Sequence, residues 1–513
     1  MHASPDTERQ GIVGTLTMWL LTQCKQYRTV ILSTLIAGLA AHLFFLSQKL
    51  VTFDDSLFTY GHTVSSGRWG LGMLKLLVPP CSMPWFHGMA SLLLMSATMV
   101  TLVKIYNIQD NIGRVLLPAV VITSAVHTSI FLFMFTSTPY ALAILLATLS
   151  VYHVLRPGRR ALAWACVCLI LSLSIYQVYL LLAVALLLVA LSLRLLDKRD
   201  ISRADLLRWS QRLGLYLFVS LAAYLAIALV GIALKGGMGA SNYAYAVSTD
   251  NPVALSEHFT GVFTRFADLF TQGKLGLINT PLSVVLHLVL MVTLLVVVLC
   301  RQWRQGSKWR MAVQALLLLV GLPATINFCW LLFAPEHWNT LTVYPFVAIY
   351  VLAAALLKLC DRHRWVYDLI ALCLAGITIN DIYYDNRTYL QVHQQNVNTF
   401  AFYSGLATQV KLLPELNAHS RLALIGHASH LVYDSDQGFG YNETRGAAKL
   451  INSYSRGHYI KKQIGFDIPI LTASEPEYQR LANDQRVQAM PAYPFDGSIQ
   501  VIDSVIVVKL GEP

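Results

Sequence analysis

The chain has 513 residues, of which 56% are hydrophobic and only 13% charged, and its mean hydropathy is +0.55. This composition excludes a large soluble core and predicts a protein that crosses a membrane several times. The formal net charge of +11 does not indicate nucleic-acid binding, because the basic residues gather in short clusters between apolar segments.

Several apolar stretches approach or exceed the length of a bilayer-spanning helix. They comprise residues 29–47, 90–103, 116–135, 213–234, 281–300, 311–333 and 344–357. None shows the alternation of a transmembrane β-strand, so the predicted fold is predominantly α, a polytopic transmembrane helical bundle. The basic clusters lie at residues 156–160, 194–212, 301–310 and 358–364. Placing them in the cytoplasm gives about eleven spans, with the N-terminus cytoplasmic and the C-terminus outside.

The N-terminal segment is polar through Gln10 and shows no cleavage site after a short apolar core. We expect it to be a cytoplasmic N-terminal segment and not a signal peptide that is removed.

Two adjacent carboxylates, Asp54 and Asp55, follow the first span within a predicted external loop at residues 50–85. An unpaired carboxylate at a membrane edge is a candidate functional group. Adjacent side chains diverge by about 100° on a helix, so we expect only one to point into a site. The other would cap a helix or pair with a cation. In the alternative interpretation both residues simply cap the segment that begins at Ser56.

A short apolar segment begins at Gly67-Arg68-Trp69 and ends at Pro79-Pro80. It is too short to cross a bilayer and predicts a helix lying in the outer interface. Arg68 either binds a phosphate through its two-pronged guanidinium or anchors this helix together with Trp69.

Tyr176 and Gln177 end the fifth predicted span at its outer face. Polar groups at this depth need hydrogen-bond partners, which are either a neighbouring helix or a ligand. His127, alone on an apolar span, is expected to be a packed, hydrogen-bonded core residue. The longest external loop is predicted at residues 235–279.

A second external loop contains Glu336, His337 and Trp338. The two titratable side chains suit a proton acceptor, a cation ligand or a sugar contact, and the indole suits stacking on a sugar face. The alternative is an interfacial tryptophan with two solvated neighbours.

The composition changes after Tyr384, where charges of both signs appear together and short apolar runs alternate with turn residues. We therefore predict a transmembrane catalytic domain over residues 1–384 and a small external α/β domain over residues 385–513. Residues 499–510 predict two strands around a tight Asp503-Ser504 turn. The eight cysteines show no metal-binding spacing, and no disulfide framework is expected.

Three motifs carry a resemblance to a known family. They are the acidic pair within DDSLFTYGHTVSSGRWGLGML, the SLSIYQVYL segment of the fifth span, and PFDGSIQVIDSVIVVKL near the C-terminus. With them the chain resembles the GtrII-type serotype-converting glucosyltransferases of bacterial and phage O-antigen modification clusters. The loop at Glu336 matches no motif of that family.

This resemblance implies a GT-C-type integral membrane transferase of the bacterial inner membrane. Such an enzyme takes glucose from undecaprenyl-phosphate-glucose and adds it to a sugar of the lipid-linked O-antigen polysaccharide on the periplasmic face. It also implies that Asp54 and Asp55 are the catalytic candidates and that Tyr176 and Gln177 line the same cavity.

The residues suit this chemistry independently of the resemblance. A polyprenyl phosphate is a good leaving group, so the reaction needs one carboxylate to accept the proton of the attacking hydroxyl. It also needs cations to hold the departing phosphate, for which Arg68, Lys75, Arg265 and Lys274 are available. No cofactor is expected, and dependence on a divalent cation is left open.

Two other classes of protein compete with this interpretation. A transporter or flippase of lipid-linked sugars would show paired repeats and charged or broken helices near the midplane, and the sequence shows no repeat. An acyltransferase or scaffold partner would need a nucleophile or a histidine-based site within the membrane, and His127 has no companion in the sequence.

Overall fold

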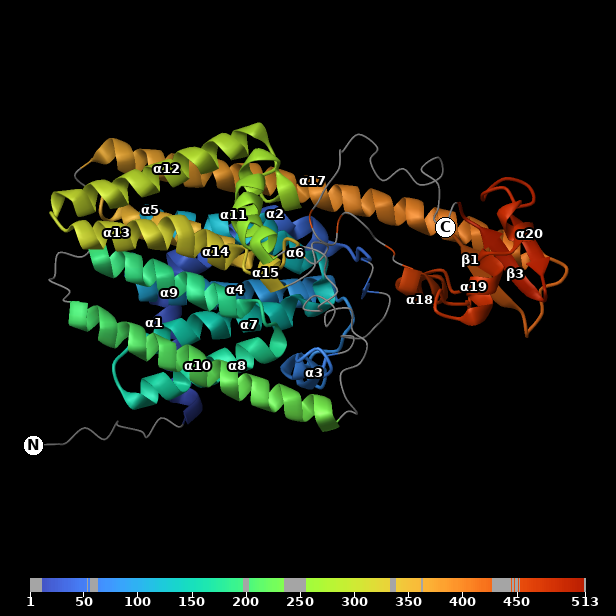
Figure 1. Cartoon of the computed structure of the whole chain (residues 1–513), viewed down its shortest axis with the longest axis horizontal. Coiled ribbons are helices and arrows are strands. Elements are labelled where there is room, and N and C mark those ends of the chain that lie inside the picture. The colour runs from blue at the N-terminus through green and yellow to red at the C-terminus, as the bar shows by residue number, and fades with distance from the viewer. Residues whose placement is uncertain are drawn as a thin grey trace, which may run out of the picture.

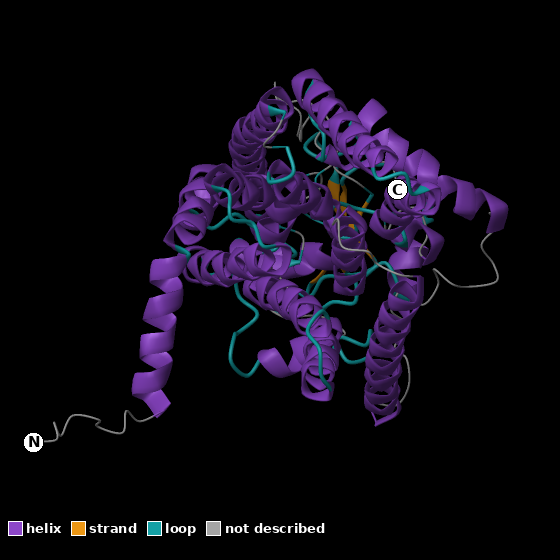
Figure 2. Cartoon of the chain, turned by 90° about the vertical axis from the view of Figure 1, so that its left-hand side faces the viewer, coloured by secondary structure: helices purple, strands orange, loops and turns teal. Residues whose placement is uncertain are grey.

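The computed structural model describes residues 12–52, 54–55, 63–196, 203–234, 255–332, 338–360, 363–426, 444, 447, 451 and 453–511. Most of these residues are helical, and one small sheet lies near the C-terminus (Figure 1). Seen from one end, the helices pack around one another, and the helix nearest the N-terminus stands apart at the edge (Figure 2).

Within the described residues, eight helical segments are long and apolar enough to cross a membrane. They are α2 (Arg28–Ser47), α4 (Pro84–Tyr106), α7 (Met134–Val154), α9 (Tyr179–Leu196), α10 (Arg203–Leu234), α12 (Pro281–Arg304), the run Lys308–Ile326, and α17 (Arg364–Lys411). The run Lys308–Ile326 comprises α13 (Lys308–Leu316), the π-helical turn Leu317–Gly321 and α14 (Leu322–Ile326).

A ninth crossing is formed if α5 (Asn111–Thr123) and α6 (Ala125–Leu132) are one span bent by 49°. The bend lies at Ser124, whose backbone is extended and therefore breaks the helix. Two shorter helices also belong to the bundle, α8 (Arg159–Ile175) and α16 (Val347–Leu357). The count of eleven spans stays a prediction.

The bundle is apolar both inside and outside. Every residue of α16 is buried, and this helix contacts α5, α9, α12 and α17. Large apolar side chains also face outward, for example Phe218 and Val230 on α10 and Leu282 on α12. Outward-facing apolar side chains of this kind suit contact with lipid.

Several shorter helices and turns complete the structure around the spanning helices. They are α1 (Ile12–Gln26), α3 (Trp69–Leu74), α11 (Leu255–Thr271), the 3₁₀ turn η3 (Lys274–Gly276), α15 (Cys329–Leu332) and the 3₁₀ turn η6 (Tyr344–Phe346). Helix α3 ends earlier than the sequence predicts: it stops at Leu74, well before the two prolines, and turns follow. Leu76 and Leu77 are highly exposed there, as expected for residues at a membrane interface.

Helix α17 has 48 residues and is therefore about 70 Å long, more than twice the thickness of a bilayer core. It runs along the bundle and projects beyond it toward the sheet (Figure 1). The predicted domain boundary at residue 384 falls inside this continuous helix, and the division into two domains stays a prediction.

The sheet has the order β1-β3-β2, built from β1 (Arg421–Ile425), β2 (Ile499–Ile502) and β3 (Val505–Lys509). Strand β1 pairs with β3 in parallel and β2 pairs with β3 antiparallel. Asp503 and Ser504 both have positive φ, at 49° and 65°, as a two-residue hairpin turn requires. The prediction of two strands around this turn is confirmed.

We use the term C-terminal unit for the sheet, α18 (Ser453–Gln463), α19 (Pro476–Ala482), α20 (Gln485–Gln488) and the last turns of α17. Its apolar core joins Phe402 and Leu406 of α17 to the sheet and also includes Val51, from the segment after α2. The Val51 amide donates to Asn396 Oδ1 at 2.9 Å, and Asn396 Nδ2 donates to the Val51 carbonyl at 3.1 Å. The segment that leads to the acidic pair is therefore fixed against α17.

Candidate functional site

The structure gives the two members of the acidic pair different surroundings. Asp54 is half-buried, whereas Asp55 is only 3% exposed. Ser82 Oγ donates a hydrogen bond to Asp55 Oδ1, and Lys49 Nζ lies 3.9 Å from Oδ2. Burial raises the pKa of Asp55, and the Ser82 hydrogen bond and the Lys49 charge partly oppose this shift. Asp55 thus has the environment of a strengthened base.

The segment that carries Ser82 is held by two helices. His87 on α4 makes a hydrogen bond of 3.0 Å through Nε2 to the carbonyl of Cys81. Its Nδ1 lies 3.1 Å from the Thr138 hydroxyl on α7. The hydroxyl that orients Asp55 is therefore supported from the bundle.

Arg68 and Tyr176, two of the residues predicted to bind substrate, lie together. The guanidinium carbon of Arg68 is 4.8 Å from the centre of the Tyr176 ring, which is a cation–π contact. Arg68 itself is half-buried at the start of α3. This contact directs the charged group toward the break between α8 and α9, where Tyr176 lies.

Gln177 fastens the backbone next to Arg68. Its Nε2 donates to the Ser66 carbonyl at 2.7 Å and to the Tyr224 hydroxyl at 2.9 Å. The Tyr224 hydroxyl donates in turn to the Gly67 carbonyl at 3.1 Å. Gly67 has φ +76°, and a Cβ there would lie 2.7 Å from the Tyr224 oxygen, so this position requires glycine. In this structure Gln177 positions the loop that presents Arg68.

Tyr176 belongs to a group of four tyrosines, here called the tyrosine cluster, of which the sequence analysis identified only this one. The Tyr176 ring stacks on Tyr140, with centroids 4.8 Å apart and planes at 17°. Tyr179 makes edge contacts with Tyr176 at 5.5 Å and with Tyr344 at 5.6 Å. All four are buried. A buried aromatic group beside a cation suits the binding of a sugar phosphate.

His127 lies next to the tyrosine cluster. It is fully buried, as predicted, and its Nδ1 is 3.5 Å from the Tyr344 hydroxyl. Its Nε2 has no hydrogen-bond partner, so the expected hydrogen-bonded state is only partly confirmed.

Trp338 belongs to a different cluster. Its Nε1 donates to Asn327 Oδ1 at 3.3 Å, and its ring meets Trp330 edge-on at 5.7 Å. The guanidinium carbon of Arg265 lies 4.8 Å from the Trp330 ring and 5.9 Å from the Trp338 ring. The other two residues predicted in this loop, Glu336 and His337, lie outside the described residues.

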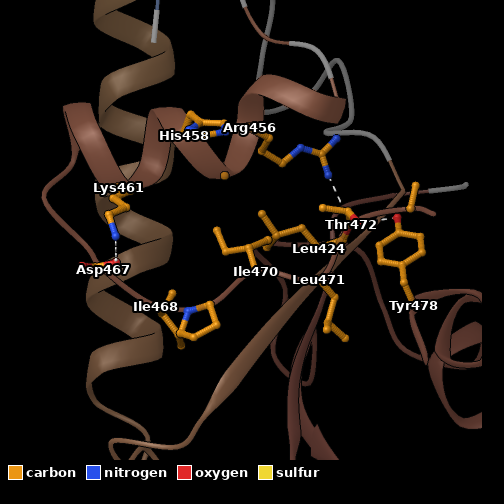
Figure 3. A pocket seen from close by; sticks show the side chains of 13 residues that line it. Leu424, Arg456, His458, Lys461, Asp467, Ile468, Ile470, Leu471, Thr472 and Tyr478 are labelled. Atoms are coloured by element: carbon orange, nitrogen blue, oxygen red, sulfur yellow. Dashed lines mark hydrogen bonds and ion pairs between the residues drawn. The ribbon is translucent and has the colours of Figure 1, made fainter. Parts of the chain in front are cut away.

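The C-terminal unit contains a hollow of about 350 Å³, within the range of small-ligand sites (Figure 3). Arg456 lies at one side, where its guanidinium donates to the carbonyls of Leu424 at 3.1 Å and Gly426 at 3.4 Å. Lys461 forms an ion pair of 2.6 Å with Asp467 at the edge of the hollow opposite Arg456 and Tyr478 (Figure 3). Further lining side chains are His458, Ile468, Ile470, Leu471, Thr472 and Tyr478.

The described ranges contain no group of three or more His, Cys, Asp or Glu side chains that could hold a metal ion. The groups described above are the buried carboxylate of Asp55 and, separately, the Arg68 guanidinium beside the tyrosine cluster.

The comparison with protein families gives a match over the region that carries these residues. The family described as "Glucosyl transferase GtrII" matches residues 43–356, which is more than half of the chain. The matched region contains the acidic pair, Arg68, the tyrosine cluster and Trp338. No curated protein and no solved structure matches the chain. Over this extent the match shows that the chain belongs to the GtrII glucosyl transferase family.

Proposed function

We propose that this membrane glucosyltransferase moves glucose from undecaprenyl-phosphate-glucose to a sugar of the lipid-linked O-antigen at the periplasmic face of the inner membrane. The observation that carries the proposal is the buried Asp55 carboxylate, with its raised pKa, held by Ser82 beside Lys49. It lies in the segment that joins α2 to the Arg68 loop, within the region matched by the family.

The proposed chemistry uses one base and one anion-binding cation. The Asp55 carboxylate accepts the proton of an acceptor hydroxyl, whose oxygen forms a bond to the anomeric carbon of glucose. The bond between that carbon and the phosphate oxygen breaks, and the electron pair leaves with the polyprenyl phosphate. Arg68 stabilises the phosphate, and the tyrosine cluster offers ring faces and hydroxyl groups to the sugar. Asp55 then releases its proton to water.

The direct test is transfer by the purified protein in nanodiscs. Labelled glucose supplied on the polyprenyl phosphate should appear on the lipid-linked acceptor, and the transfer should need no nucleotide sugar. Movement of the intact donor across a liposome membrane without transfer of glucose would instead favour the flippase interpretation.

The proposal places the N-terminus and the basic loops in the cytoplasm and the C-terminal unit in the periplasm. A phosphatase reporter fused after residue 450 should therefore be active, whereas a β-galactosidase reporter at the same position should be inactive. Fusions within residues 301–310 should show the opposite pattern and serve as the control. A reporter that reads residue 450 as cytoplasmic would contradict this orientation.

We assign contact with the acceptor polysaccharide to the hollow of the C-terminal unit. Arg456→Ala should raise the KM for a long acceptor about tenfold and leave the rate with a short acceptor unchanged, because a hydrogen bond to a charged group is worth about 1.5–3 kcal/mol. Arg480→Ala is the matched control, since Arg480 is exposed and pairs with Asp503 away from the hollow. Equal KM values for the two variants would remove the hollow from the proposal.

A further inference from the structure

Two carboxylates lie deep within the helical bundle, outside the segment matched by the family. Asp381 and Asp385 are 2% and 0% exposed. They are four residues apart on α17, so both project from the same face of that helix. The proposed transfer reaction uses neither residue.

In each carboxylate, one oxygen accepts a hydrogen bond and the other oxygen does not. Asp381 Oδ1 accepts from Asn380 Nδ2 at 3.2 Å, and Asp385 Oδ1 accepts from the Thr128 hydroxyl on α6. The Oδ2 atom of each is buried and has no hydrogen-bond partner. No Lys or Arg of the described residues forms an ion pair with either group.

Two tyrosines that interact with the carboxylates, Tyr389 and Tyr350, have hydroxyl groups that are hydrogen-bonded to histidines. Tyr389 interacts electrostatically with Asp385, and its hydroxyl lies 2.7 Å from His42 Nδ1. His42 Nε2 lies 2.8 Å from the carbonyl of Ile122. A carbonyl only accepts, so in the neutral imidazole Nε2 carries the proton and Nδ1 accepts from Tyr389. The hydroxyl proton of Tyr389 is therefore directed away from the carboxylate.

A similar arrangement occurs beside Asp381. Tyr350 on α16 interacts electrostatically with Asp381, and its hydroxyl lies 2.9 Å from His287 Nε2. His287 Nδ1 lies 2.7 Å from the carbonyl of Ser283, which assigns the ring proton to Nδ1. Both carboxylates thus face tyrosine oxygens whose protons are engaged with neutral histidines.

Two neighbouring negative charges without a cation are strongly unfavourable inside a membrane protein, because desolvation costs several kcal/mol for each ion. Carboxylate oxygens are ligands for hard cations, and Mg²⁺ is commonly held by one or two carboxylates with water completing its coordination. We propose that Asp381 and Asp385 bind one divalent cation of this class through their Oδ2 atoms. This two-carboxylate site differs from a cluster of three or more protein ligands, which the described residues do not contain.

The proposal is tested by Mn²⁺ binding to the full-length protein after removal of metal, measured from the loss of the free-ion electron paramagnetic resonance signal. The wild type should bind one Mn²⁺. Asp381→Asn and Asp385→Asn should each lower the affinity at least tenfold. Asp368→Asn is the matched control, because Asp368 is an exposed aspartate on the same helix, and its affinity should equal that of the wild type.

Thermal unfolding of the wild type provides a second measurement that does not depend on the variants folding. Mg²⁺ should raise the Tm of the metal-free protein, because a ligand that binds only the folded state stabilises it. A Tm that rises on acidification and is indifferent to Mg²⁺ and Mn²⁺ would show that protons neutralise the pair, and would overturn the proposal. Neither measurement uses donor or acceptor, so the result is separate from that of the transferase assay.

Discussion

Asp55→Asn should lower kcat for glucose transfer by a factor of about 10² to 10⁴, the range expected when a general base is removed. The protein should still fold and insert, because asparagine has nearly the same shape and removes a buried charge. Asp54→Asn is the matched control: it makes the same chemical change at the adjacent, half-buried position, and its effect should be much smaller. Single-turnover rates with labelled donor would measure both.

The pH dependence gives an independent check on the same residue. The base acts only when ionised, so the rate should fall as the pH drops through the pKa of Asp55. The Ser82 hydrogen bond favours the charged form, and Ser82→Ala should therefore raise this pKa further and move the acid limb of the profile to higher pH. If both aspartate variants keep near-normal turnover, the acidic-pair hypothesis is wrong and Glu336 becomes the next candidate.

The elements that the sequence predicts well are those with local signals. Long apolar runs identify the spanning helices, and the Asp503-Ser504 turn identifies the β2–β3 hairpin. The acidic pair is conspicuous because charge is rare in this chain. Each of these features is determined by neighbouring residues and by the hydrophobic period.

The features that escape prediction depend on contacts between distant segments. Tyr140 and Tyr344 are about 200 residues apart, and only the packed bundle brings both against Tyr179. Helix α17 is similarly unexpected: its residues as far as Val392 still belong to the core of the bundle, and from Phe402 they join the core of the C-terminal unit. The composition becomes polar along this stretch while the helix continues to Lys411. A change in composition here marks a change of surroundings and not the end of an element.

Arg68→Ala should weaken binding of the lipid donor at least tenfold, which corresponds to about 1.4 kcal/mol. The expectation follows from the position of the guanidinium, 4.8 Å above the Tyr176 ring at the edge of the tyrosine cluster. Arg68→Lys should recover part of the affinity, because lysine keeps the charge but cannot make a two-pronged contact with a phosphate. Competition binding with the polyprenyl phosphate donor reports both changes directly.

Lys75→Ala provides the control for nonspecific attraction, since Lys75 is an exposed cation just after α3. A donor held by a specific site should be insensitive to this change, whereas general attraction to the surface would make the two alanine variants similar. If Arg68 only anchors α3 at the interface, both Arg68 variants should bind donor as the wild type does, because lysine also reaches the headgroup layer. Equal affinity in wild type and Arg68→Ala would then shift the phosphate site toward Arg265 or Lys274, of which Arg265 is already placed beside Trp330 and Trp338.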